Sequence, residues 1–199
     1  MPGMKWELVQ RKLVYDGFFK LSQLRVRYQL YGGGWGNIEA RELFERSDAV
    51  AVLPYDPTRD KVVLIEQFRV GAMAAPEGPW LTEIVAGLID DGEGAEETAR
   101  REAREEAGCE LQELLHICDY YASPGGFSER IAVYLGKTDS RDLDGIKGLA
   151  AEGEDIRVFV VDSEEAFRML ASGKIMSAMP IVALQWLQLN RERVRAVWP

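Results

Sequence analysis

The chain has 199 residues, 47% of them hydrophobic and 29% charged, which suits one globular domain with an elaboration. Its formal net charge is −9, and this acid excess disfavours nucleic acid as a partner. No apolar run approaches the ~20 residues that span a bilayer, and residues 1–10 contain no signal-peptide core. We therefore expect a cytoplasmic protein with no membrane partner.

The first 46 residues predict a small antiparallel β unit. Residues 24–30 alternate between apolar and polar side chains, as a strand does, and residues 8–15 do so less cleanly. Residues 31–37 are rich in glycine and predict a turn, after which residues 38–44 return as a strand. Such a unit is too small to bury much core alone, so it should pack on the rest of the chain or on another subunit.

Residues 47–199 predict a main domain in which strands and helices interleave. Polar or turn-rich links are expected at 54–60, 72–79 and 145–154. Strands are expected at 48–53, 62–68, 80–86, 114–121, 131–135 and 156–161. Helices are expected over 94–107, from the capping-box spacing of 162–165 to about 173, and from Pro180 onward. The class is therefore α/β (α+β), a mixed sheet with helices on both faces.

The cysteines and the histidine predict no site of their own. Cys109 and Cys118 stand in apolar surroundings, which favours buried free thiols over a disulfide framework. His116 is the only histidine and lies in an apolar stretch typical of a strand. A histidine-based triad and a zinc site are both disfavoured, since zinc sites usually use several His or Cys ligands.

Three glutamates in the predicted helix 94–107 carry the strongest chemical signal. Glu102, Glu105 and Glu106 stand at i, i+3 and i+4, so they share one face, where like charges destabilise a helix. Mg²⁺ prefers carboxylate oxygen and would offset that repulsion. Arg101 could hold one carboxylate in place. Taken alone, the same residues could be an ordinary solvated helix face.

The spacing around this helix adds specificity to that signal. The pattern is Gly87, Glu93, Arg101–Glu102, Glu105–Glu106 and Gly108. It resembles the Nudix box, and the resemblance implies an α/β/α sandwich in which Mg²⁺ polarises a diphosphate that water attacks.

The resemblance also implies roles for individual residues. Arg101 and Glu93 would form a structural ion pair, while Glu102 and Glu106 would ligate the metal. Glu105 would hold a further ion directly or through water. The backbone carbonyl of Ala86 is a ligand in the relatives that act on ADP-ribose.

Beyond the box, the chain resembles the ADP-ribose pyrophosphatase branch of the Nudix hydrolases. The resemblance rests on residues 66–69, on 123–126 with 128–130, on 152–156 and on 183–187. It implies Mg²⁺-dependent cleavage of ADP-ribose to AMP and ribose 5-phosphate, with Mn²⁺ able to substitute. GDP-mannose or another nucleoside diphosphate-sugar is the alternative substrate. A module that binds ADP-ribose without cleaving it is the alternative of another class, although this chain keeps every acid of the box.

Several residues are candidates for substrate binding. Arg69 ends a strand and could contact a phosphate through two nitrogens, or form only a surface ion pair. The loop of Ser123, Pro124 and Gly125 would let a ligand approach the backbone, or be an ordinary turn. By the resemblance, Phe18 and Phe19 would stack on adenine rather than fill a core. By the same resemblance, further substrate contacts are expected at Arg41, Glu42, Arg46, Leu88 and Glu129, although Arg41, Glu42 and Arg46 could be ordinary surface charges.

The general base should be a carboxylate that aims a water molecule at phosphorus. The resemblance assigns Glu152 as the proton acceptor and Glu154 as a metal ligand on the same glycine-containing loop. Glu105 is the rival base because it lies on the helix beside the metal ligands. The resemblance also implies a homodimer with active sites shared between subunits. The number of metal ions and the phosphorus attacked stay open.

Overall fold

We analysed a computed structural model of the chain, which describes residues 3–198. The described residues fall into two compact units. Unit 1 contains residues 3–48 together with residues 121–130, and unit 2 contains residues 49–120 and 131–198. The return of residues 121–130 to the N-terminal unit gives that unit a second segment, which comes from the middle of the chain.

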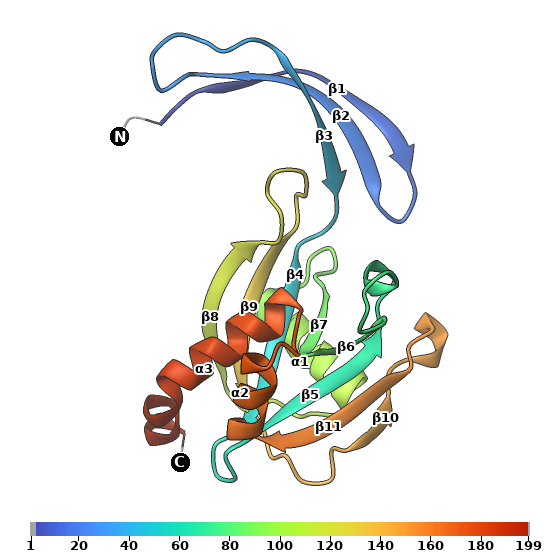
Figure 1. Ribbon diagram of the computed structural model, residues 1–199, viewed down its shortest axis with the longest axis vertical. Coiled ribbons are helices and arrows are strands. Elements are labelled where there is room, and N and C mark those ends of the chain that lie inside the picture. Colours follow the sequence, from blue (N-terminus) through green and yellow to red (C-terminus); the bar gives the residue numbers. More distant parts are fainter. Residues whose placement is uncertain (1–2, 199) are drawn as a thin grey trace. The chain divides into compact units, whose positions relative to one another are not determined.

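Unit 1 is built on a three-stranded antiparallel sheet in the order β1-β2-β3 (Figure 1). The strands are β1 (Trp6–Asp16), β2 (Lys20–Tyr28) and β3 (Glu39–Glu45). The alternating pattern of residues 24–30 is thus the second half of the central strand. Every residue of β1 is exposed, and β2 contributes the fully buried Ser22. A three-stranded sheet without helices covering it buries little apolar surface, as the composition of this segment predicts.

Unit 2 contains a mixed eight-stranded sheet whose main path runs β10-β11-β5-β4-β9-β8. Two short strands lie off this path, since β6 pairs with β5 and β7 pairs with β4. Strands β4 and β9 are parallel, whereas β5 pairs with β4 and β11 in antiparallel fashion. The strands are β4 (Ala49–Asp56), β5 (Lys61–Phe68), β6 (Trp80–Glu83), β7 (Val85–Leu88), β8 (Leu114–Tyr121), β9 (Arg130–Lys137), β10 (Gly145–Lys147) and β11 (Ile156–Asp162).

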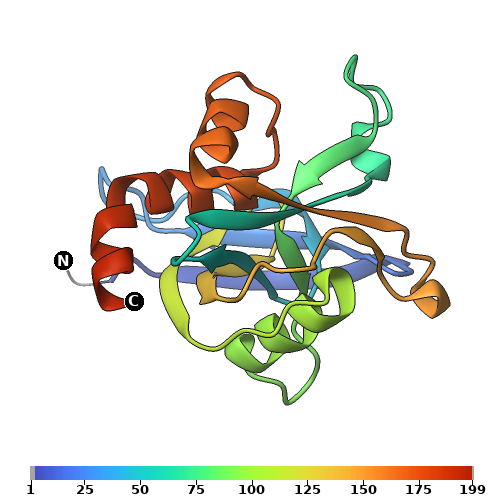
Figure 2. The ribbon, with the colours of Figure 1, turned by 90° about the horizontal axis from the view of Figure 1, so that it is seen from below.

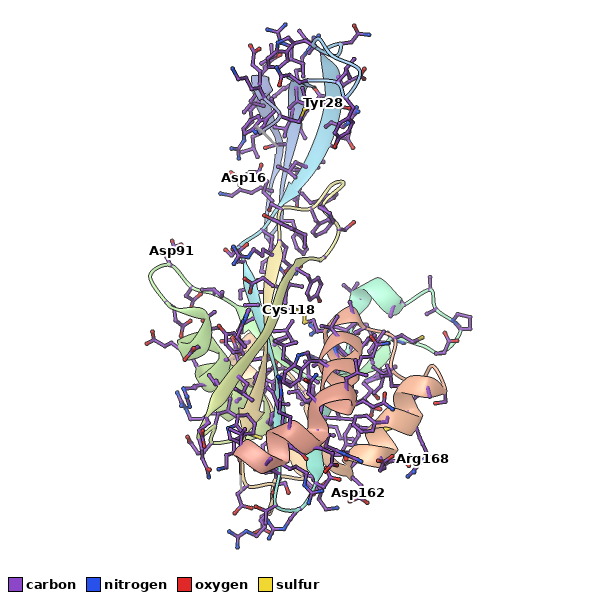
Figure 3. The ribbon with its side chains drawn as sticks, turned by 90° about the vertical axis from the view of Figure 1, so that its left-hand side faces the viewer. Asp16, Tyr28, Asp91, Cys118, Asp162 and Arg168 are labelled. Atoms are coloured by element: carbon purple, nitrogen blue, oxygen red, sulfur yellow. The ribbon has the colours of Figure 1, made fainter. Side chains whose placement is uncertain are left out.

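Three α-helices cover the two faces of this sheet. They are α1 (Ala95–Ala107), α2 (Ser163–Ala171) and α3 (Ala178–Val197), with short 3-10 turns at η1 (Val70–Ala72) and η2 (Ala150–Glu152). Figure 2 shows α1 on one face of the sheet and α2 with α3 on the other, and Figure 3 shows the same three layers from a second direction. None of the helices within residues 3–198 has the length and apolar character needed to cross a bilayer.

The central strand β4 explains why two cores form. All eight of its residues are buried, and successive side chains point to opposite faces of the sheet. Ala51 and Leu53 are on alternate positions and pack with α2 and α3 in one apolar cluster. Val50 and Val52 pack with α1 in the other. The expected mixed sheet with helices on both faces is confirmed.

The structure corrects the predicted single strand at residues 80–86. The chain forms β6 and β7 instead, with a break at Ile84. Strand β6 pairs with β5, and β7 changes partner to β4. A pattern of apolar residues does not record which neighbour a strand pairs with, so the change of partner could not be read from it.

Three further expectations differ from the structure in local detail. The expected loop at 145–154 contains both β10 and η2. Asp162 is the N-cap residue of α2, but its side chain does not cap the helix and accepts a hydrogen bond from Lys61 Nζ at 2.8 Å instead. Figure 3 labels Asp162 at this end of α2.

Cys109 is buried as expected, whereas Cys118 is only half-buried, and both are free thiols.

Candidate active site

Helix α1 carries the acidic platform, and its ends follow the sequence. Its residues are mostly Ala, Glu and Arg, which favour helix, and Glu96 and Glu97 complement the positive end of the helix dipole. Gly108 ends the helix with a φ of 65°, a left-handed conformation that suits glycine. Ala99 and Ala103 are fully buried against the sheet. Their small side chains let the helix approach the sheet closely, which sets how far the glutamates of α1 lie from the sheet.

The three glutamates of α1 differ in burial although they share a face. The side chain of Glu105 is 31% exposed and that of Glu102 is 14% exposed. Glu106 as a whole residue is only 3% exposed, and its Oε2 accepts a hydrogen bond from the backbone N–H of Ala86 at 3.0 Å. The platform therefore becomes more buried toward β7, where the chain places Ala86 and Gly87.

Gly87 is needed because the carboxylate of Glu102 lies against its backbone. A Cβ atom added at Gly87 would come within 1.9 Å of Glu102 Oε1. Any other residue at this position would push the carboxylate away. The glycine at the start of the box thus sets the position of one glutamate rather than providing an unusual backbone angle.

Arg101 ties the platform to the loop before the helix. Its Nε and Nη2 donate to the two carboxylate oxygens of Glu93 at 3.1 and 3.0 Å. Its Nη1 donates to Glu102 at 2.8 Å and to Glu105 at 3.0 Å. These hydrogen bonds hold the pKa of Glu93 below its ordinary value. One guanidinium thereby orders three carboxylates, in the way that the spacing of the box implies for Arg101 and Glu93.

Glu106 is a buried carboxyl group without an ion-pair partner among residues 3–198. Its pKa is raised to about 8, mainly by burial and to a smaller degree by Glu102 and Glu154, although the hydrogen bond from Ala86 opposes this. Among residues 3–198 it makes no ion pair, although Arg69 is near enough to lower its pKa. Burial also raises the pKa of Glu102. A buried carboxylate with a like-charged neighbour is stabilised by a bound divalent cation, so these residues fit one.

The loop before β11 supplies the two other acids. The chain turns through η2, and Gly153 takes a φ of 74° there. Oε2 of Glu154 accepts a hydrogen bond from the backbone N–H of Leu149 at 3.0 Å, while Glu152 is exposed. Within the described part of the chain, no three carboxylates, histidines or cysteines are close enough together to form a metal-binding group. Glu154 nevertheless lies close enough to Glu102 and Glu106 to raise both of their pKa values.

Arg69 follows β5 and is held by a residue that the sequence did not single out. Its Nε donates to Oε2 of Glu83, the last residue of β6, at 2.8 Å. Gln67 donates to the same oxygen at 3.4 Å, and the hydroxyl of Ser177 donates to Oε1 at 2.7 Å. Glu83 was missed because it fell inside the expected strand 80–86. Its only signal was a charged residue between the apolar Leu81 and Ile84.

The remaining predicted substrate residues, except Leu88, belong to unit 1. Phe18 is 81% exposed, and its ring meets that of the half-buried Phe19 edge-on at 5.0 Å. The guanidinium of Arg46 lies 5.5 Å from the centre of the Phe19 ring, and its Nε is 3.2 Å from Oε1 of the buried Glu129. Phe18 therefore offers an open aromatic surface, whereas Phe19 and Arg46 support each other.

Arg41 and Glu42 are exposed neighbours on β3. With Gln23 and Ala40 they line a cavity of about 310 Å³ in unit 1. Nη1 of Arg41 donates to the backbone oxygen of Ala40 at 2.8 Å, so the guanidinium folds back along its own strand. Nη1 also lies 3.7 Å from Oε2 of Glu39, and within residues 3–198 no hydrogen bond engages the other donors of this arginine.

The loop at residues 123–126 packs against β3. Gly126 N–H donates to Ser123 O at 3.1 Å, which closes a turn, and Phe44 N–H donates to Gly126 O at 2.8 Å. Phe127 stacks on Phe44 with ring centres 5.3 Å apart. Pro124 and Gly125 are exposed, and a Cβ atom added at Gly125 would meet nothing within 4 Å. Residues 123–126 therefore form a turn, and there is free space around Gly125 at its tip.

Two groups of predicted residues thus form, one in each unit. Unit 2 gathers the predicted metal ligands and acid–base candidates around α1, together with Leu88, whose backbone oxygen lies 3.5 Å from Nη2 of Arg101. Unit 1 contains the residues expected to contact the substrate other than Arg69 and Leu88, which belong to unit 2. The roles assigned to these residues stay predictions.

Fold and carboxylate platform together define a class of protein. A family profile described as the NUDIX domain matches residues 45–179. The chain belongs to the Nudix family, which confirms the resemblance drawn from the box.

Individual relatives narrow the comparison. The chain is 46% identical over 192 residues to the ADP-ribose pyrophosphatase of Escherichia coli (strain K12), covering 96% of this chain and 92% of that protein. It is 42% identical over 195 residues to the ADP-ribose pyrophosphatase of Haemophilus influenzae (strain ATCC 51907 / DSM 11121 / KW20 / Rd), covering 96% and 90%. A GDP-mannose pyrophosphatase of Enterobacter sp. (strain 638) is 32% identical over 192 residues, covering 94% and 97%.

A solved structure shares the fold. The structure described as "Crystal structure of ADP compounds hydrolase" matches with a TM-score of 0.71 and 20% identity, covering 96% of this chain and 97% of that one. At this identity the likeness shows the fold alone. It confirms the expected α/β/α arrangement.

Proposed function

We propose that the chain hydrolyses the diphosphate bond of ADP-ribose, giving AMP and ribose 5-phosphate, with Mg²⁺ as the metal and Mn²⁺ as a substitute. The observation that carries this proposal is the carboxylate of Glu106, which is buried beside Glu102 and Glu154 and accepts a hydrogen bond from the backbone N–H of Ala86. Nudix hydrolases generally need a divalent metal. Relatives named ADP-ribose pyrophosphatase are more similar to this chain than the relatives named GDP-mannose pyrophosphatase, which favours the ribose compound.

In this proposal Glu102, Glu106, Glu154 and the carbonyl of Ala86 hold the metal. Bound there, the cation would polarise a phosphate oxygen and acidify a water molecule. Arg101 keeps Glu102 fixed, and Gly87 leaves room for it. Arg69 offers its guanidinium to a phosphate of the substrate, with which arginine forms paired hydrogen bonds.

The proton of the attacking water passes to a carboxylate, which we assign to Glu152. A new P–O bond forms with the water oxygen, and the bond from that phosphorus to the bridging oxygen breaks. Glu152 is exposed on the loop of η2, where its backbone N–H donates to Leu149 O at 2.9 Å, and its side chain has no hydrogen bond or ion pair among the described residues. Glu105, the rival, already accepts a hydrogen bond from Arg101 at 3.0 Å. Glu105 is thus held on the helix by Arg101, whereas the side chain of Glu152 is free to turn toward a water molecule, which favours Glu152.

We propose that unit 1 binds the adenosine part of ADP-ribose and also forms the interface of a homodimer. The exposed side chains of its strands include large apolar ones, among them Trp6, Leu8, Val14 and Tyr15 of β1. Apolar side chains in such number are typical of a surface that a partner covers. We propose a second copy of the chain as that partner, with unit 1 of one subunit completing the site of the other. Sedimentation at micromolar concentration should then give twice the chain mass of 22.4 kDa. A monomer with full activity would contradict the dimer.

A substrate screen tests the proposed activity. Equal amounts of ADP-ribose, GDP-mannose, NADH and ADP-glucose are incubated with the protein and Mg²⁺, and the products are separated by chromatography. We expect AMP and ribose 5-phosphate from ADP-ribose, with kcat/KM at least about tenfold above the others, a difference of roughly 1.4 kcal/mol. Faster cleavage of GDP-mannose would favour the alternative substrate. Tight binding of ADP-ribose without turnover would favour a binding module.

A further inference from the structure

The hydrogen bonds around Arg69 leave one end of its guanidinium unused. Its Nε is engaged by Glu83, while neither Nη group has a hydrogen-bond partner in the portion of the chain that the structure describes. The arginine side chain is 42% exposed and that of Glu83 is 12% exposed. The glutamate is therefore the buried, fixed partner of the pair, and the two Nη groups are the ones presented outward.

Arg69 and Glu83 project from the face of the sheet that carries α1. Glu83 stands opposite Ile65 across the β5–β6 pair, and side chains alternate along β5, so Gln67 continues the row of Val63 and Ile65. Val63 and Ile65 pack in the apolar cluster that contains α1. Arg69, two residues after Gln67, continues that row and is close enough to Glu106 to lower its pKa. The unused Nη groups thus lie on the side of the carboxylate platform.

Glu83 is itself held from two sides. Gln67 donates to Oε2, and the hydroxyl of Ser177 donates to Oε1. Ser177 is the N-cap residue of α3, yet its side chain makes no capping hydrogen bond because it is engaged by Glu83. A helix N-cap normally uses such a hydroxyl for its own backbone, and losing that bond destabilises a helix. Here the hydroxyl fixes the carboxylate that orients Arg69.

We infer that Glu83 is a positioning residue, which fixes Arg69 through Nε so that both Nη groups face a phosphate of the bound diphosphate. The inference rests on the proposed function, in which Arg69 contacts the substrate. A guanidinium that is already oriented loses less rotational freedom on binding, and its paired hydrogen bonds match two phosphate oxygens. Glu83 itself touches no substrate and acts only through Arg69.

The test compares steady-state kinetics on ADP-ribose for wild type, Arg69→Ala, Glu83→Ala and the double variant. Arg69→Ala should raise KM roughly 10- to 100-fold with kcat within about twofold, because the contact forms equally in ground and transition states. Glu83→Ala should raise KM roughly 5- to 20-fold, because Arg69 remains but is mobile. In the double variant, KM should match that of Arg69→Ala within about twofold, since the effect of Glu83 passes entirely through Arg69.

Two further variants separate positioning from folding. Glu83→Gln keeps an acceptor oxygen for Arg69. Its increase in log KM over wild type should therefore be at most about half the increase seen in Glu83→Ala. Glu66→Ala is the matched control, because Glu66 on the same hairpin also accepts a hydrogen bond from an arginine, Arg157 at 3.2 Å, and its KM should stay at the wild-type value. Melting temperatures of all variants show whether any has lost its fold.

The outcomes distinguish the inference from the function on which it rests. Failure of the wild type to cleave ADP-ribose, or an unchanged KM in Arg69→Ala, overturns the substrate role of Arg69 and the positioning role with it. A raised KM in Arg69→Ala beside an unchanged or lowered KM in both Glu83 variants overturns positioning alone. Additive effects of Arg69→Ala and Glu83→Ala in the double variant also overturn it, because they would show that Glu83 acts independently.

Discussion

The α1 platform of unit 2 and the β1–β3 sheet of unit 1 are organised in opposite ways. On the platform, Glu106 is buried and Arg101 bonds three carboxylates at once, so each side chain is fixed by its neighbours. In unit 1, β1 is exposed along its whole length and Phe18 projects freely. Charges that are held before substrate arrives suit metal binding and catalysis, whereas exposed aromatic and apolar side chains suit partners that cover them.

The largest effect expected from this contrast comes from Glu106→Gln. The variant keeps the shape and the acceptor oxygen for Ala86 but removes the charge that a cation needs. The metal supplies several kcal/mol of transition-state stabilisation, so kcat on ADP-ribose should fall roughly 10⁴-fold or more. Glu97→Gln, an exposed acid in the first turn of the same helix, is the matched control and should keep wild-type activity. A Glu106→Gln enzyme with the wild-type rate and metal affinity would contradict the platform.

The second effect concerns the loop of η2, which is the exposed part of unit 2. Glu152→Gln should lower kcat by roughly 10²–10⁴, the usual range for a positioned base, and leave the affinity for Mg²⁺ almost unchanged. Parallel measurements on Glu105→Gln sharpen the result. A comparable loss in Glu105→Gln, together with less than about a threefold loss in Glu152→Gln, would move the base onto α1.

A smaller effect is expected from Phe18→Ala in unit 1. Stacking of a base on an aromatic ring contributes about 1–3 kcal/mol, so KM for ADP-ribose should rise roughly tenfold, with kcat nearly unchanged. Tyr31, which is also exposed in unit 1 and has no proposed role, provides the control through Tyr31→Ala. Equal KM values for wild type and Phe18→Ala would remove Phe18 from the substrate site.

The smallest effect is on the stability of the metal-free protein. Burial raises the pKa of Glu106 to about 8, so between its ordinary pKa and that value the folded state binds more protons than the unfolded state. Stability must then fall as pH rises through this range. We expect the melting temperature in a chelator to drop by several degrees between pH 5 and pH 8, more steeply in wild type than in Glu106→Gln. If the melting temperatures of wild type and Glu106→Gln changed equally with pH, Glu106 would not be a buried acid with a raised pKa.

The same contrast explains how much could be predicted from sequence. The platform was readable because helical periodicity places Glu102 and Glu106 on one face, and local spacing alone carries that information. The layers around the sheet followed from apolar runs such as β4. Glu83 could not be found, because its role depends on the pairing of β6 with β5 and on Ser177, which lies 94 residues away.

Local patterns also failed where tertiary contacts competed with them. The capping-box spacing at 162–165 predicted a capped helix, but the carboxylate of Asp162 is engaged by Lys61 across the β5–β11 pair. The polar stretch 145–154 was expected to be a loop, yet residues 145–147 pair with β11 as a strand. The deciding partner of Asp162 lies 101 residues away, whereas residues 145–147 pair with the next strand along the chain.

The most direct test of the two-region account measures metal and substrate binding separately. Mn²⁺ binding is followed by electron paramagnetic resonance, and ADP-ribose binding is followed by calorimetry in Ca²⁺, a cation chosen to slow turnover, for wild type, Glu106→Gln and Phe18→Ala. We predict that Glu106→Gln loses Mn²⁺ binding, whereas Phe18→Ala binds Mn²⁺ like wild type and loses roughly tenfold in ADP-ribose affinity. Wild-type Mn²⁺ binding by Glu106→Gln, or loss of Mn²⁺ binding in Phe18→Ala, would contradict the division of tasks between the two units.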